Sequence, residues 1–186
     1  MQKRRLDPAL DAAQYVKRVW FGVAVIAAVV VAADQLSKTW AEHALIDDVK
    51  HVVGSLQFTL TYNRGVAFGV AEGFAPILVA LTIIAVLVVM AYKAPRLSPA
   101  GVLGVGLVLG GALGNVCDRL FRGHGGAVVD FIDLQWWPIF NLADAAVVSG
   151  AVILLFVLSR SDDSSEGSSN GSSDQSASHD QPKDFL

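Results

Sequence analysis

Three groups of polar and charged residues stand at the ends of apolar stretches in this sequence. The groups are Asp34 with Lys38, Asn115 with Asp118 and Arg119, and Asn141 with Asp144. Spacings of three and four within each group place its members on one face of a helix. Charges are costly in hydrocarbon and usually mark function there. These groups are therefore the first candidates for chemistry.

If these groups meet at one depth in the folded chain, several aspartates lie together in a partly buried layer. Such a layer favours acid–base chemistry on a water molecule. Two carboxylates that share a site cannot both ionise easily, so one of them keeps its proton. One member of such a pair can activate a water, and the other can protonate a leaving amine. This is the chemistry of an aspartic protease.

Each group also has a simpler structural interpretation. Asp34 and Lys38 could form only an interfacial ion pair, and the group at 115–119 could only hold the following loop. Asp144 could complement the dipole of the helix that it begins. The four histidines have no metal-ligand spacing, and Ser37 has no nearby histidine. The residues therefore indicate neither a metal site nor a serine nucleophile.

The composition indicates a membrane protein. Hydrophobic residues make up 53% of the chain and charged residues 17%, whereas soluble domains carry about 25% charged residues. Four apolar stretches are predicted to span the membrane as helices: 19–40, 74–92, 100–117 and 140–158. The single cysteine, Cys117, excludes an intramolecular disulfide, and no basic patch suggests nucleic acid.

Two mixed segments separate these helices and contain β-like patterns. Residues 52–68 alternate apolar and polar side chains with period two, which predicts a short strand or hairpin. Residues 127–134 are also β-like, and Trp136 and Trp137 suit a membrane interface. The predicted fold class is an all-α membrane protein, a bundle of four transmembrane helices with a small extracytoplasmic β-like cradle.

Basic residues predict the orientation of the chain. Most of those outside the mixed segments lie in 1–18, in the 93–99 turn and at Arg160, so the positive-inside rule makes these parts cytoplasmic. Both termini are then inside, and the three polar groups reach one depth near the outer face. We divide the chain into a basic cytoplasmic stem (1–18), the four-helix membrane domain (19–158) and a cytoplasmic tail (159–186), whose Ser/Asp/Gly composition predicts disorder.

Five segments, in order, resemble the type II (lipoprotein) signal peptidases of bacteria. They read DQLSK at 34–38, TYNRGVAF at 61–68, GALGNVCDR at 111–119, VVDF at 128–131 and FNLAD at 140–144. The resemblance covers residues 19–158. The segment from Arg119 to Asp130, which contains Gly123, Gly125 and Gly126, is longer than the family pattern, and the segment from Asp130 to Asn141 is shorter.

The resemblance implies an intramembrane aspartic endopeptidase that needs no cofactor. Such an enzyme removes signal peptides from diacylglyceryl-modified prolipoproteins by cutting before the lipidated cysteine. The family's catalytic aspartates map onto Asp130 and Asp144. Its supporting and substrate-binding residues map onto Asp34, Lys38, Asn63, Asn115, Asp118, Arg119 and Asn141.

The implied partners are lipid-modified prolipoproteins and membrane lipid, without nucleic acid. The implied location is the bacterial cytoplasmic membrane, which the chain crosses several times, and we expect a monomer. Arg64 and Gly65 are added as substrate-binding candidates, because glycine permits a close backbone approach to an extended peptide.

The residues alone lead to the same pair of aspartates by a weaker route. Asp118, with Arg119 beside it, suits a structural anion. Asp130 and Asp133 are three positions apart in a β-like run, so they should point to opposite faces. Apolar neighbours would desolvate Asp130, and Asp144 lies at the start of the last helix.

Two other functions remain open on the sequence. Intramembrane carboxylates also serve proton relays, so a small proton- or ion-coupled transporter is the main alternative. A transporter would place them near the middle of the membrane, often at broken helices. A structural or assembly protein is the third candidate.

Overall fold

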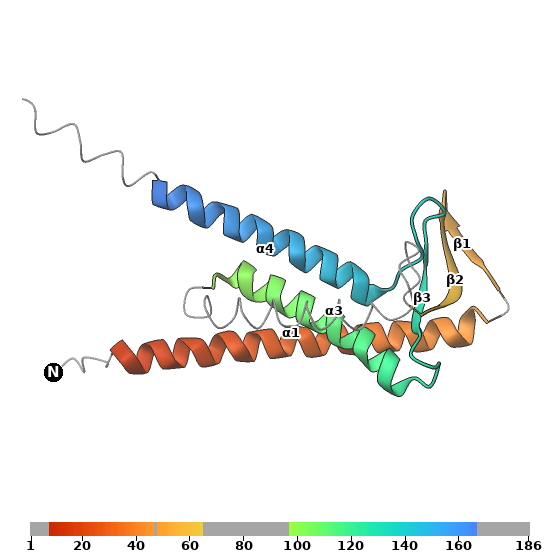
Figure 1. The fold of residues 1–186 in the computed structure, drawn as a ribbon, viewed down its shortest axis with the longest axis horizontal. Coiled ribbons are helices and arrows are strands. Elements are labelled where there is room, and N and C mark those ends of the chain that lie inside the picture. Colours follow the sequence, from red (N-terminus) through yellow and green to blue (C-terminus); the bar gives the residue numbers. More distant parts are fainter. Residues whose placement is uncertain (1–7, 47, 65–96, 167–186) are drawn as a thin grey trace, which may run out of the picture.

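The computed structural model describes residues 8–46, 48–64 and 97–166. Within these ranges it contains three helices and one three-stranded sheet. The helices are α1 (Pro8–Ala44), α3 (Pro99–Phe121) and α4 (Leu142–Glu166), and the strands are β1 (Lys50–Val53), β2 (Leu56–Asn63) and β3 (Val128–Asp133). The helices run alongside one another, and the sheet stands across one end of them (Figure 1). The predicted helix at 74–92 lies outside the described residues.

Two of the described helices are long and apolar enough to cross a bilayer. They are Asp11–Ala44 within α1 and Pro99–Phe121, and a shorter apolar helix covers Leu142–Val157. Much of the apolar surface of α1 is exposed, including Phe21 and Leu36, each 72% exposed. Lipid can solvate such a surface, whereas water would not favour a stripe of this length.

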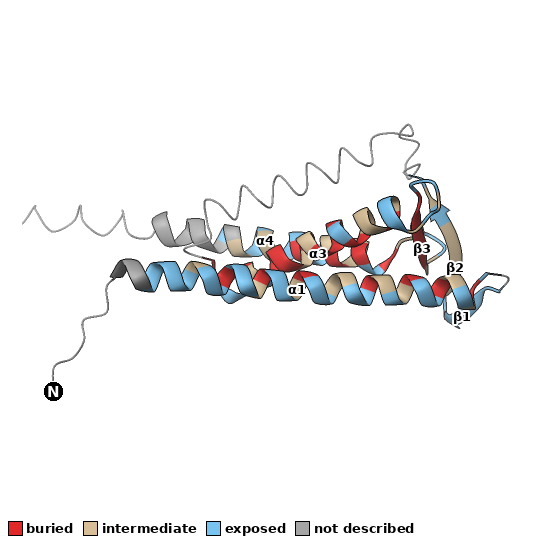
Figure 2. Ribbon diagram, turned by 90° about the horizontal axis from the view of Figure 1, so that it is seen from below, coloured by how far each residue is buried: buried red, intermediate tan, exposed pale blue. Residues whose placement is uncertain are grey.

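The middle helix of the three, α3, is the most buried (Figure 2). Two of its glycines, Gly106 and Gly110, allow close packing against α1. A Cβ added at Gly106 would come within 2.6 Å of Ile26, and one at Gly110 would come within 2.9 Å of the Ala27 backbone. These glycines therefore let the two helices approach more closely than larger residues would.

The sheet is antiparallel, in the order β1-β2-β3. The predicted hairpin is confirmed within the described residues, and Gly54 supplies the positive φ of 57° that its turn uses. The β-like run predicted at 127–134 is β3. The buried ring of Phe131 packs with Trp40 and Phe58, so the sheet rests on the end of α1.

The last helix differs from the sequence prediction at both ends. It begins at Leu142 rather than near residue 140, and Asn141 precedes it as a cap. It runs to Glu166, so residues 159–166 are helical, where we predicted disorder. Extending an existing helix adds one hydrogen bond for each residue fixed, which lets a polar segment continue it. The tail beyond, at 167–186, lies outside the described residues.

Candidate active site

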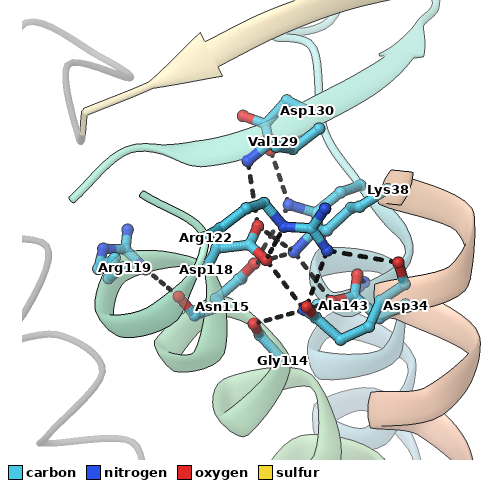
Figure 3. Close-up of polar contacts among 12 residues, drawn as sticks. Asp34, Lys38, Gly114, Asn115, Asp118, Arg119, Arg122, Val129, Asp130 and Ala143 are labelled. Atoms are coloured by element: carbon cyan, nitrogen blue, oxygen red, sulfur yellow. Dashed lines mark hydrogen bonds and ion pairs between the residues drawn. The ribbon is translucent and has the colours of Figure 1, made fainter. Parts of the chain in front are cut away.

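A buried lysine holds the end of α1 against α3. The Lys38 ammonium lies 2.9 Å from Asp34 Oδ2 and 2.8 Å from Asp118 Oδ2, and it donates to Asn115 Oδ1 at 3.0 Å (Figure 3). The side chains of Lys38, Asp34 and Asp118 are 0% exposed. The Asp34–Lys38 pair expected from the sequence is therefore present. Asp118 joins it, which gives the buried ammonium ion two carboxylate partners.

The expected pairing of Asp118 with Arg119 is wrong. Arg119 does not bond its carboxylate and instead donates to the Asn115 carbonyl at 3.2 Å. Asp118 Oδ1 accepts from Arg122 Nε at 3.0 Å. Neighbouring residues on a helix point in different directions, whereas residues four apart share a face. The i,i+4 spacing of Asp118 and Arg122 was a signal in the sequence that we missed.

The two carboxylates bound to Lys38 also fix two backbone positions. Asp34 Oδ1 accepts a hydrogen bond from the Ala143 N–H at 3.0 Å. Asp118 Oδ2 accepts one from the Val129 N–H at 3.1 Å. Ala143 directly precedes Asp144, and Val129 directly precedes Asp130. The Lys38 cluster thus anchors the chain next to both aspartates that the sequence singled out.

Asp130 lies on β3 and is only 2% exposed. Its two carboxylate oxygens accept hydrogen bonds from Asn63 Nδ2 at 2.9 Å and from Asn141 Nδ2 at 2.7 Å. Burial raises the pKa of Asp130 to about 6. The hydrogen bonds from the two amides oppose this rise, and the negative charge of Asp144 adds to it.

Asp133, three residues further along β3, has a different environment. It is half-buried, accepts from Gln57 Nε2 at 2.6 Å and accepts from the Gln135 N–H at 2.7 Å. Neither of these contacts involves Asp130 or the asparagines that bond it. The Lys38 cluster, Asn115, Asn141 and Asp144 form a connected polar layer. Of the two aspartates on this strand, Asp130 is the one that joins it.

Asp144 lies in the first turn of α4 and caps that helix together with Asn141. The Asp144 N–H donates to Asn141 Oδ1 at 2.9 Å, and the Asn141 N–H donates to Asp144 Oδ2 at 3.2 Å. This is a reciprocal capping arrangement. The other carboxylate oxygen accepts from Asn115 Nδ2 at 2.8 Å. Asp144 therefore has the helix-end role of the simpler interpretation and a place in the polar layer as well.

Two asparagines connect the two aspartates. Asn141 bonds Asp130, Asn115 bonds Asp144, and Asn141 Nδ2 donates to Asn115 Oδ1 at 3.2 Å. Each amide thus holds one carboxylate and contacts the other amide. The arrangement fixes two carboxylates from β3 and α4 at the end of the helices where the sheet stands.

An apolar cavity of about 460 Å³ opens beside Asp144. The described residues that line it are Leu134, Trp136, Trp137, Phe140, Asp144, Ala145, Val148 and Ser149. Asp144 is the one acidic side chain among the described residues of this lining. A carboxylate at the wall of an apolar cavity can reach a reacting bond whose flanking groups are themselves apolar.

The remaining candidates are Arg64, Gly65 and Arg119. Arg64 is exposed at the end of β2, and Gly65 lies outside the described residues. Arg119 is half-buried and is attracted by the charges of Asp144 and Asp130. In the described ranges no group of three or more His, Cys, Asp or Glu side chains is arranged to hold a metal ion.

Comparison with known proteins identifies the family. The family model described as "Signal peptidase (SPase) II" matches residues 26–160. The lipoprotein signal peptidase of Syntrophomonas wolfei is 41% identical over 133 residues, which are 69% of this chain and 87% of that protein. The lipoprotein signal peptidase of Rhodococcus jostii is 43% identical over 137 residues, 70% of this chain and 69% of that protein.

Solved structures agree with these sequence matches. A bacterial membrane enzyme determined by the in meso method has a TM-score of 0.60 and 30% identity, and the match covers 73% of this chain and 91% of that one. A second structure of the same description also has a TM-score of 0.60, over 81% of this chain. The buried aspartates, the apolar helices and these matches lead to one conclusion: the chain belongs to the signal peptidase II family of bacterial integral membrane enzymes.

Proposed function

We propose that this enzyme removes signal peptides from diacylglyceryl-modified prolipoproteins and that Asp130 and Asp144 are its catalytic dyad. Family membership supports the reaction and weighs against the transporter and the assembly protein. The observation that carries the dyad is the hydrogen-bonded link between two carboxylates. The buried Asp130 and the half-buried Asp144 are joined through the side chains of Asn141 and Asn115. The raised pKa of Asp130 supports a shared proton.

The reaction needs one ionised and one protonated carboxyl group. The ionised aspartate takes a proton from a water, whose oxygen bonds the scissile carbonyl carbon. The protonated aspartate gives its proton to the amine nitrogen as the carbon–nitrogen bond breaks. The new amine belongs to the lipidated cysteine, and the new carboxylate ends the released signal peptide. Asn63 and Asn141, as donors to Asp130, hold that carboxyl group in place.

The apolar cavity beside Asp144 supports a lipid-modified substrate. Its wall of aromatic and aliphatic side chains offers an apolar environment next to the reacting group. Arg64 and Gly65 are proposed to hold the extended peptide near the cut, and membrane lipid is the surrounding medium. These assignments name the substrate class but not particular lipoproteins.

The finer topology is also a proposal. Residues 74–92 would form the second of four membrane-spanning helices, with both termini in the cytoplasm and the site near the outer face. The polar groups of α1, α3 and α4 meet at the end of the helices where the sheet stands, which supports one layer and one cradle (Figure 1). Residues 19–158 would then act as one membrane domain, in a monomer.

A cleavage assay tests the function and the dyad together. Purified protein is incubated with a lipid-modified prolipoprotein and with its unlipidated form, and loss of the signal peptide is followed. Wild-type enzyme should cut only the lipidated substrate. Asp130→Asn and Asp144→Asn should each abolish cleavage, and the double variant should be no worse, because the pair acts as a unit.

The matched control is Asp133→Asn, which changes the neighbouring aspartate of the same strand. It should keep most of the activity. A folded Asp130→Asn enzyme that still cleaves, beside an inactive Asp133→Asn enzyme, would show that the dyad is assigned to the wrong aspartate.

A further inference from the structure

Arg122, at the C-cap of α3, ties that helix to α1. Its guanidinium donates to Asp118 Oδ1 at 3.0 Å, to Glu42 Oε2 at 2.6 Å and to Gln35 Oε1 at 2.8 Å. The side chains of Arg122 and Glu42 are only 12% and 18% exposed. Screening by solvent is therefore limited, and the planar fork of arginine holds all three partners in one geometry.

One route runs from the Glu42–Arg122 ion pair to the strand that carries Asp130. Arg122 binds one oxygen of Asp118, and the other oxygen accepts the Val129 N–H at 3.1 Å. Val129 is 0% exposed and directly precedes Asp130. Figure 3 shows Arg122 and Asp118 beneath Val129 and Asp130. The orientation of the Asp118 carboxylate thus helps to fix the position of the strand.

A second route starts from the other oxygen of Glu42. Glu42 Oε1 lies 2.6 Å from His124 Nε2. The His124 ring packs against Tyr62, with a centroid separation of 4.4 Å. Tyr62 lies on β2, where it pairs with Val129 of β3. Both routes from Glu42 therefore end at the same residue.

The loop between α3 and β3 gives these contacts their importance. Gly123, Gly125 and Gly126 adopt φ values of 80°, 63° and 85°. Glycine loses the most conformational freedom when it is fixed, so this loop has little stiffness of its own. Arg122 and His124 are the side chains that attach it to α1.

We propose that Glu42 and Arg122 are positioning residues for Asp130. They act through Val129, which they hold by the Asp118 carboxylate and by the His124–Tyr62 contact. Neither side chain bonds Asp130 itself. The proposal rests on the proposed function, because it assumes that Asp130 is catalytic.

Kinetics on the full-length enzyme test the proposal. Arg122→Gln and Glu42→Gln should each lower kcat by about 10-fold to 100-fold, since small displacements of a catalytic group cost this much. KM should stay within about twofold, because the substrate contacts are unchanged. Arg122→Lys keeps the charge but loses the fork, so its kcat should lie between those of wild type and Arg122→Gln. The kcat of the Glu42→Gln, Arg122→Gln double variant should be no lower than that of the less active single variant.

Asp48→Asn is the matched control. It breaks an exposed ion pair near the same end of α1, in which Lys50 Nζ lies 3.4 Å from Asp48 Oδ2. Its kcat should equal that of wild type. Folded Glu42→Gln or Arg122→Gln enzymes with wild-type kcat, or losses that multiply in the double variant, would overturn the proposal.

Amide hydrogen exchange gives a readout that does not need activity. In Glu42→Gln the Val129 amide should exchange faster, while amides of the β1–β2 pairing stay unchanged. Unchanged exchange at Val129 would overturn the proposal, and so would faster exchange with unchanged kcat. In the second case Asp130→Asn separates the two failures: if it still cleaves, the dyad falls too, and if it is inactive, only the positioning role falls.

Discussion

Replacing Lys38 by methionine should destabilise the protein strongly. Methionine fills a similar volume but removes the positive charge that lies 2.9 Å from Asp34 and 2.8 Å from Asp118. The side chains of the two aspartates are 0% exposed, so water cannot replace the lost partner. Breaking a buried ion pair from one side costs about 3–5 kcal/mol. The exposed Asp48–Lys50 pair, by contrast, should be worth about 0.2–1 kcal/mol.

The charge balance of the cluster makes a sharper prediction. In wild type, Lys38 pairs with Asp34 and Asp118, and Arg122 pairs with Asp118 and Glu42. Among the described residues Lys38 is the one cation paired with Asp34, so Lys38→Met leaves that carboxylate unpaired, and adding Asp34→Asn removes the unpaired charge. The double variant should therefore be more stable than Lys38→Met alone, although it carries one more substitution.

Unfolding of the purified variants in one detergent measures these differences. Wild type, Lys38→Met, Lys38→Met with Asp34→Asn, and Asp48→Asn would be compared at one pH. Asp48→Asn should be close to wild type. The electrostatic reasoning is refuted if Lys38→Met unfolds like wild type, or if the double variant is less stable than Lys38→Met by the full cost of a second lesion.

Three further predictions concern the strand, the substrate and the topology. The pKa of Asp130 is raised from 3.8 to about 6, so the folded state binds the proton more tightly and stability should fall as the pH rises from 4 to 6, by up to about 3 kcal/mol. Asp130→Asn should remove this dependence in unfolding curves, and an unchanged slope would contradict it. Arg64→Ala, at an exposed position, should slow prolipoprotein processing while leaving the thermal melt unchanged; wild-type kinetics would remove Arg64 from the site. A reporter fused after Glu166 should be active only in the cytoplasm and one inserted at Gly54 only outside, and the reverse pattern would refute the orientation.

The elements of this fold follow largely from local patterns in the sequence. Apolar runs predicted α1, α3 and α4, and period-two alternation predicted the hairpin of β1 and β2. The errors lie at the boundaries: α1 runs from Pro8 to Ala44 where 19–40 was predicted, and α4 begins at Leu142 and continues to Glu166. Hydrophobicity marks which part of a helix contacts lipid, but hydrogen bonding decides where the helix ends, and helix termini therefore extend past the apolar run.

The site divides in the same way between local and distant contacts. The Asp34–Lys38 pair follows from an i,i+4 spacing that any helix provides, and the depth of the polar groups follows from the order of the apolar runs. The bond from Asp34 to the Ala143 N–H joins positions 109 apart, and the bond from Lys38 to Asn115 joins positions 77 apart. No local pattern specifies such partners, because they depend on how closely the glycines of α3 let the helices approach. Composition and spacing thus determined the class of the protein and its candidate aspartates, and only the packing of helices against the sheet decided which groups hold them.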